Sequence, residues 1–196
     1  MSATAGRTFP LSPGGAAEGC VPPVGSVELV DLTATPRFGL KGPGSAAWLA
    51  VQGLVLPDVN RVADLPRARL LRLGGEDFLV AGEGCEALAG LWHAAEGPKG
   101  YWSWREEGWA WMRLAGPLAG EAMARLCAVD LRDGKAAADA VVQTRVAQLD
   151  AVVVRDGRAF DLFFDIASTA FLVRAVRHAA ERAAHAAGPR ETEGRS

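Results

Sequence analysis

The sequence has few of the residues that define stapled, metal-binding or membrane proteins. It contains three cysteines, Cys20, Cys85 and Cys127, and an odd number without close spacing builds neither a disulfide framework nor a zinc site. No apolar run approaches the ~20 residues of a membrane-spanning helix, and the N-terminus lacks the basic and apolar regions of a secretory signal. We therefore expect a cytoplasmic protein with reduced cysteines and no membrane partner.

An excess of one charge is also lacking. The 21 Lys and Arg residues against 23 Asp and Glu residues give a formal net charge of −2, without runs of like charge. A nucleic-acid-binding protein normally carries a basic excess or a basic stripe, so we expect no nucleic-acid partner. The 196 residues, 49% of them hydrophobic, suit one globular domain or two closely packed halves.

Recognisable catalytic patterns are absent as well. His93, His178 and His185 are isolated, and the spacing of the last two (185 − 178 = 7) is too long for two metal ligands on one helix. The glycine-rich stretches do not fit the dinucleotide-binding pattern, and no phosphate-loop lysine is present. Asp161 and Asp165 flank two phenylalanines, and we interpret them as solvated residues at a strand end. We expect no catalytic, cofactor-binding or metal-binding residue in this chain.

The clearest positive feature is a strand, Gly-Pro break and helix that occur twice. Gly42-Pro43 in the first copy corresponds to Gly116-Pro117 in the second, at an offset of 116 − 42 = 74 residues. The same offset places Leu40 on Leu114. The repeat predicts an α+β fold built from internally duplicated strand–helix modules with antiparallel sheets.

We divide the chain into four parts by composition and by the repeat. These are an extended N-terminal arm (1–25), a first α+β half (26–96), a second α+β half (97–187) and a polar tail (188–196). The arm is rich in Gly, Pro, Ala and Ser, and such a segment cannot pack alone. We expect it to be ordered by lying across a partner.

Periodicity and turn residues predict the elements within each half. In the first half we expect strands at 27–32, 37–41, 70–73 and 78–81, a helix capped by Ser45 and a helix over 86–95. In the second half we expect strands at 101–105, 109–114, 141–149, 152–154 and 159–164, and two helices. The first of these helices starts at Pro117 and buries Leu118, Ala122, Met123 and Leu126; the second is capped by Ser168 and buries Phe171, Leu172, Ala175 and Ala179.

Four tryptophans, Trp102, Trp104, Trp109 and Trp111, form the most unusual local pattern. A hairpin with a two-residue turn would place all four on one face, and a three-residue loop ending at Gly108 would place the pairs on opposite faces. Gly108 favours the second geometry, because Glu disfavours positive φ.

The tryptophans have two interpretations. One is simple core filling. The other is a partner interface, since Trp is enriched in interface hot spots, and we extend this candidate interface to Phe9 and Pro10 of the arm.

Several segments of the chain, taken in order, resemble the gamma subunit of heterotetrameric sarcosine oxidase and related secondary-amine-demethylating flavoenzymes. The segments are residues 31–33, 36–44, 46–49, 56–61, 71–79, 113–117, 127–131, 143–145 and 160–163. The resemblance covers roughly residues 26–182. The chain departs from the family pattern mainly over residues 97–111, which contain the tryptophans.

The resemblance implies a truncated aminomethyltransferase fold, like that of the glycine-cleavage T-protein. It implies a non-catalytic, structural gamma-type subunit of a complex that oxidatively demethylates sarcosine or a related N-methyl amino acid. FAD, FMN, NAD and tetrahydrofolate would be bound by partners, the larger alpha-type and beta-type flavoprotein subunits, and zinc by a small delta-type subunit.

Two alternatives stay open. One is a stand-alone folate-binding, aminomethyltransferase-like protein that uses the cleft between the halves, for which Asp31 and Glu76 are the candidate carboxylates. The other is a small assembly chaperone of the same fold.

Overall fold

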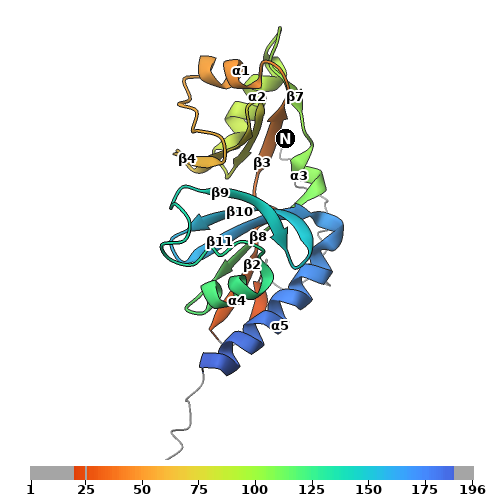
Figure 1. Ribbon diagram of the computed structural model, residues 1–196. Helices are drawn as coiled ribbons and strands as arrows, with labels where there is room; N and C mark the ends of the chain where they lie inside the picture. Colours follow the sequence, from red (N-terminus) through yellow and green to blue (C-terminus); the bar gives the residue numbers. More distant parts are fainter. Residues whose placement is uncertain (1–19, 25, 188–196) are drawn as a thin grey trace, which may run out of the picture.

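The computed structural model describes residues 20–24 and 26–187, which form four stacked layers (Figure 1). Helices α1 and α2 cover a five-stranded sheet, here called the first sheet, in the order β4-β5-β6-β3-β7. The first sheet packs face to face on a six-stranded second sheet, in the order β1-β2-β8-β11-β10-β9. Helices α4 and α5 cover the far face of the second sheet. The predicted α+β class with antiparallel sheets is confirmed.

The elements follow one another with short connections. The strands are β1 Cys20–Val24, β2 Val27–Asp31, β3 Arg37–Lys41, β4 Arg61–Leu65, β5 Ala68–Gly74, β6 Asp77–Ala81, β7 Tyr101–Trp102, β8 Trp109–Ala115, β9 Val141–Val146, β10 Leu149–Asp156 and β11 Ala159–Asp165. The helices are α1 Ser45–Val51, α2 Cys85–Ala94, α3 Arg105–Gly108, α4 Ala119–Leu126 and α5 Thr169–Ala187, with a 3₁₀ turn η1 at Ile166–Ser168.

The predicted duplication is confirmed by the topology. Apart from β1, the strand order β9-β10-β11-β8-β2 of the second sheet repeats the order β4-β5-β6-β3-β7 of the first. Helices α1 and α4 begin at Ser45 and Ala119, again 119 − 45 = 74 residues apart. Gly42 and Gly116 have φ of 92° and 107°, a left-handed conformation that a Cβ disfavours. A Cβ on Gly116 would also overlap the carbonyl oxygen of Ser26.

Each half places its first strand in the other half's sheet. Strand β2 pairs with β8 of the second half, and β7 pairs with β3 of the first half. The boundary between residues 96 and 97 therefore divides the sequence repeat but not the sheets.

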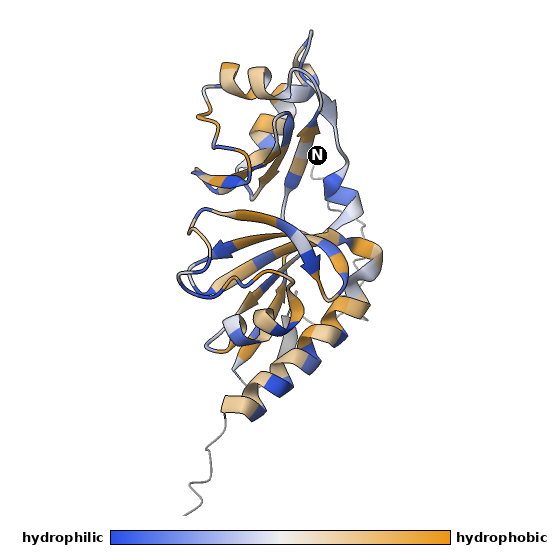
Figure 2. Ribbon diagram, viewed as in Figure 1, coloured by the Kyte–Doolittle hydropathy of each residue, from blue (hydrophilic) through white to orange (hydrophobic). Residues whose placement is uncertain are grey.

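Three apolar cores fill the spaces between the four layers. The core under α1 and α2 contains Phe38 and Phe78, and the core under α4 and α5 contains Met112 and Leu162. The third core lies between the sheets and includes Leu71, Leu73, Leu79, Trp111, Val152, Val154 and Phe163. Figure 2 shows hydrophilic and hydrophobic residues alternating along α5, as expected for a helix with one buried face.

Several local predictions are confirmed. The hairpin β5–β6 turns near Gly74-Gly75, and the hairpin β10–β11 turns at Asp156-Gly157. Ala122 and Met123 of α4 are buried, and Leu126 and the N-cap residue Leu118 are partly buried beside them, as the helical periodicity predicts.

The prediction of a single strand over residues 141–149 is wrong, because the segment spans β9 and the start of β10. Ala147 and Gln148 have φ of 51° and 68° and form a tight turn between β9 and β10. Positive φ in two consecutive residues is usual for a two-residue hairpin, but it normally selects Asn or Gly, so the sequence lacks the usual signal. Strand β4 was also not predicted, because its side chains are mostly half-buried and carry no clear alternation.

Three predictions about helix ends and faces are wrong. Ser45 does not cap α1; it is the first helical residue, and its hydroxyl donates to the Gly42 carbonyl at 2.8 Å. Ser168 lies in η1, whose start is capped by Asp165. The predicted buried face of α5 is wrong in half: Leu172 and Ala179 are buried as predicted, but Phe171 and Ala175 are not, and the face also contains Val176, Ala180 and Ala183. The small side chains of an Ala-rich helix define its buried face poorly, so tertiary packing decides it.

The end of the predicted N-terminal arm forms a strand of the second sheet. Strand β1 runs antiparallel to β2, whereas Phe9 and Pro10 of the predicted interface lie outside the described residues. Among the helices of residues 20–24 and 26–187, none has the length and apolar character needed to span a bilayer.

Candidate functional site

Residues 101–109, here called the crossover segment, carry the chain from the first sheet to the second (Figure 1). The segment begins as β7, where Trp102 pairs with Leu40, turns through α3, and ends where β8 enters the second sheet. The tryptophan hairpin is therefore wrong in both proposed geometries. Residues 101–105 do not pair with residues 109–114, because the two stretches belong to different sheets.

Arg105 provides the physical reason for the crossover. It is 8% exposed; its Nη1 donates to the Phe78 carbonyl at 2.9 Å and its Nη2 to Asp77 Oδ1 at 2.6 Å. The guanidinium also stacks on Trp109, 4.7 Å from the ring centroid. A buried charge is costly unless it is paired, so these partners on the first sheet oblige the chain to turn at this point.

Arg37 holds the other side of the crossover segment. This residue is 5% exposed, and its guanidinium donates to the carbonyls of Thr33 (2.6 Å), Thr35 (3.1 Å), Glu106 (3.3 Å) and Trp109. One side chain of β3 thereby binds the turn between β2 and β3, helix α3 and the first residue of β8. The crossover segment is fixed by two buried arginines, a pattern that local periodicity does not indicate.

Three of the four tryptophans belong to the protein's own packing. Trp111 is 7% exposed and stacks on Phe163 between the sheets, with ring centroids 5.2 Å apart. Half-buried Trp102 stacks on Phe38 at 5.0 Å and on His93 at 4.7 Å. Trp109 is also half-buried, beside Phe163. For these three, core filling describes the side chain best.

Trp104 differs from the other three. Its side chain is 63% exposed, and its φ of 52° lies in the left-handed region, which costs roughly 1 kcal/mol or more for a residue with a Cβ. Neighbouring Tyr101 is 71% exposed. A large aromatic side chain held in solvent by a strained backbone is a reasonable contact residue for a partner. Of the four tryptophans, Trp104 therefore stays a candidate for the predicted interface, and exposed Tyr101, which was not predicted, joins it.

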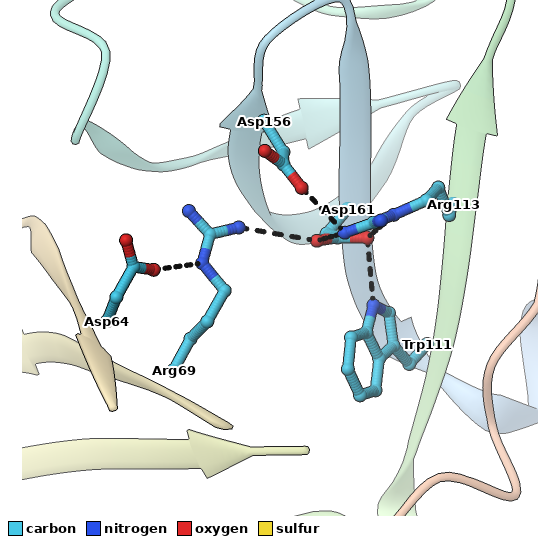
Figure 3. Close-up of polar contacts among 6 residues, drawn as sticks. All are labelled: Asp64, Arg69, Trp111, Arg113, Asp156 and Asp161. Atoms are coloured by element: carbon cyan, nitrogen blue, oxygen red, sulfur yellow. Dashed lines mark hydrogen bonds and ion pairs between the residues drawn. The ribbon is translucent and has the colours of Figure 1, made fainter. Parts of the chain in front are cut away.

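Asp161 is the residue whose role the sequence did not indicate (Figure 3). It is only 1% exposed and lies within β11, not at a solvated strand end as predicted. Arg113 donates to both of its carboxylate oxygens, from Nε at 2.8 Å and from Nη2 at 2.7 Å, and Trp111 Nε1 donates at 3.1 Å. These hydrogen bonds raise the pKa of Arg113 above its usual value.

The Asp161 cluster also joins the two sheets. Arg69, on β5 of the first sheet, approaches Asp161 Oδ2 to 3.5 Å and Asp64 Oδ1 to 3.3 Å. Asp156 accepts from Arg113 at 3.0 Å at the exposed rim. Asp165 is exposed and accepts a hydrogen bond from the Ala167 N–H at 2.9 Å. The predicted solvated strand end is therefore confirmed for Asp165 but not for Asp161.

A cleft of about 490 Å³ opens between the sheets beside the crossover segment. Its apolar lining includes Leu73 and Val152, one from each sheet. Each charged side chain in the lining has a protein partner: Arg105 pairs with Asp77, Arg145 with Asp150, and Asp165 with the η1 backbone.

The two carboxylates proposed for folate binding have local structural roles. Asp31 accepts from the Thr33 N–H at 2.8 Å, and Glu76 accepts from the Ala46 N–H at 2.8 Å at the start of α1. Neither residue lines the cleft between the sheets.

The cysteines and histidines form no cluster in the described part of the chain, where no group of three or more His, Cys, Asp or Glu residues could hold a metal ion. His178 and His185 are exposed on α5. Cys85 is buried and Cys127 half-buried, both as free thiols. Burial raises the pKa of the Cys85 thiol to about 12, and burial also raises that of Cys127.

Cys85 is expected to resist alkylation in the folded protein. A pKa of about 12 against the usual 9.0 leaves a thiolate fraction about a thousandfold smaller at pH 8, so iodoacetamide should modify Cys85 far more slowly before than after unfolding in urea. The thiol ionises at a lower pH in the unfolded chain than in the folded protein. The free energy of unfolding should therefore fall as pH rises from 9 towards 12. Mass spectrometry of the Cys85 peptide measures the rates, and equal rates in both states would contradict the expectation.

Comparison with known proteins supports the fold. No protein-family model and no curated protein matches the sequence. The structure is similar to a chain of the heterotetrameric sarcosine oxidase from Corynebacterium sp. U-96, solved in complex with pyrrole 2-carboxylate. The identity is 24% and the TM-score 0.72, and the match covers 84% of this chain and 89% of that chain.

A second similar structure is the glycine cleavage system aminomethyltransferase T from Bartonella henselae, with 19% identity and a TM-score of 0.58. The match covers 82% of this chain but 49% of that chain, so the protein spans about half its length. The fold expected from the family resemblance, a truncated aminomethyltransferase fold, is confirmed by both similarities.

Proposed function

We propose that this protein is a non-catalytic, gamma-type structural subunit of a heteromeric flavin-dependent complex that oxidises sarcosine or a related N-methyl amino acid. One observation carries the proposal. The structural match to the sarcosine oxidase chain extends over 84% of this protein and 89% of that chain, whereas it extends over only 49% of the aminomethyltransferase. The two chains thus match over most of the length of each, and the matched chain is part of a heterotetramer.

The use of the charged residues supports a structural role. Asp161 is neutralised by Arg113 and Arg69 and joins the two sheets, while Arg37 and Arg105 fix the crossover segment. A catalytic acid or base must reach a substrate proton, and a carboxylate held by three donors in the core does not.

The same proposal assigns the chemistry to the partners. Larger alpha-type and beta-type flavoprotein subunits would bind FAD, FMN, NAD and tetrahydrofolate and demethylate the amine, and a small delta-type subunit would bind zinc. Trp104 and Tyr101 would contact a flavoprotein subunit, since both aromatic side chains are exposed on the crossover segment.

Co-expression tests the proposal directly. The tagged chain is co-expressed with the chains that its neighbouring genes encode, and it is purified through the tag and by size exclusion. Flavin absorbance is expected to co-elute with the chain at the mass of a heteromer. A chain that elutes as a stable monomer without flavoprotein would contradict the proposal.

Calorimetry separates the proposal from the folate-binding alternative. The isolated chain is titrated with tetrahydrofolate, and no saturable heat is expected, because Asp31 and Glu76 are engaged with the backbone outside the cleft. Tight binding by the isolated chain would favour a stand-alone aminomethyltransferase-like protein.

A further inference from the structure

A second surface, distinct from the crossover segment, has the form of a helix-binding groove. It is a cavity of about 690 Å³ between the end of α4, the β9–β10 turn and the outer side of α5. Its apolar lining includes Leu126, Ala147, Phe171 and Ala175. Phe171 is 45% exposed, whereas phenylalanine is among the residues most often buried.

The charged side chains that line this groove, Arg125 and Arg182, are both positive. Arg125, His178 and Arg182 contribute to its lining, and no Asp or Glu does. Within residues 20–24 and 26–187, neither Arg125 nor Arg182 forms an ion pair, and the same holds for Arg174 and Arg177 of α5 outside the groove. A chain with a net charge of −2 therefore presents a locally cationic, apolar groove, which complements an acidic apolar partner.

The length of the groove suits an α-helix. The lining residues of α5 run from Phe171 to Arg182 along one stripe, a rise of about 16 Å at 1.5 Å per residue. Roughly three turns of a partner helix would cover this distance, with apolar residues spaced by three and four set against α5 and the end of α4.

Addition of a partner strand is disfavoured at the same place. The outer edge of β9 is already occupied, since Ala128 N–H donates to the Arg145 carbonyl at 3.0 Å and Ala147 N–H donates to the Leu126 carbonyl at 2.8 Å. The backbone thus offers no unpaired edge beside the groove to an extended peptide.

We infer that the groove between α4 and α5 binds an acidic amphipathic helix of a larger flavoprotein subunit, with apolar residues against Phe171 and Leu126 and carboxylates against Arg125 and Arg182. The inference rests on the proposed function, and it specifies where and by what chemistry one partner docks. A bound acidic helix would cover the exposed ring of Phe171 and would supply carboxylate partners to Arg125 and Arg182.

Charge reversal with a matched control tests the inference in the purified complex. The variant Arg125→Glu/Arg182→Glu is compared with Arg174→Glu/Arg177→Glu, whose exposed arginines lie on α5 outside the groove lining. Both variants change the net charge equally. The groove variant should raise the Kd for the flavoprotein chains about tenfold or more, most strongly at low salt, and the control about twofold or less. Circular dichroism verifies that both are folded.

A second measurement does not depend on charge. The thiol of an Ala175→Cys variant should react with a maleimide in the isolated chain and be protected in the complex. If the complex forms, the reversal has no more effect than the control and the thiol stays reactive, the groove inference is overturned and the proposed function stands.

The remaining outcomes are equally decisive. If the unchanged chain binds no flavoprotein subunit, the proposed function fails and the inference fails with it. If vesicles containing phosphatidylglycerol bind the unchanged chain but not the groove variant, while the complex is unaffected, the groove serves a lipid surface and the inference is overturned.

Discussion

Replacement of Asp161 by alanine is expected to lower the free energy of unfolding by about 3–5 kcal/mol, a large fraction of the roughly 5–15 kcal/mol that stabilises a typical domain. The carboxylate is 1% exposed and neutralises Arg113 and Arg69. Its removal leaves two cations close together, one from each sheet, without their shared partner. Urea unfolding followed by circular dichroism measures the change.

The matched control is Asp156→Ala, at the exposed rim of the same cluster. Asp156 also pairs with Arg113, but its side chain is 51% exposed, so water compensates for its loss and a change of about 1 kcal/mol or less is expected. Equal losses for the two variants would show that burial of Asp161 is not what makes the cluster stabilising.

Replacement of Trp104 by glycine is expected to separate stability from assembly. Glycine adopts the φ of 52° without strain, which offsets its greater entropy in the unfolded chain, so the free energy of unfolding should change by less than about 1 kcal/mol. If Trp104 is an interface hot spot, its loss costs about 2 kcal/mol or more of binding, which raises the Kd for the flavoprotein chains about 30-fold.

Two controls make this result interpretable. Val55→Ala, at a side chain that is 86% exposed far from the crossover segment in sequence, should leave both stability and binding unchanged. Trp102→Ala, which removes the ring stacked on Phe38 and His93, should destabilise the protein. A Trp104→Gly variant that assembles like the unchanged chain would exclude Trp104 from the interface.

The repeat was predictable from the sequence because its signals are local. A Gly-Pro pair after an alternating strand specifies a positive φ and a helix start, and both copies carry it. The exchange of first strands was not predictable, because it depends on Arg105 reaching Asp77 and Phe78, nearly thirty residues earlier. A hairpin and a crossover are indistinguishable without those contacts.

The candidate site shows the same limit. Alternation along β11 correctly places Asp161 and Phe163 on one face, but it does not reveal what faces them. The partners Arg113 and Arg69 come from another strand and from the other sheet, so only the three-dimensional structure distinguishes a buried ion cluster from a solvated strand end. Similarly, the Ala147-Gln148 turn lacks the residues that normally announce such a turn.

The exchange of first strands also sets the order in which the two sheets can close during synthesis on the ribosome. Strand β7 finds β3 already made, so the first sheet is complete as soon as residue 102 emerges. Strand β2 must wait for β8, which begins 109 − 31 = 78 residues later, or roughly 4–16 s at 5–20 residues per second. During that interval one edge of β2 stays unpaired in the nascent chain, where it can pair with another copy.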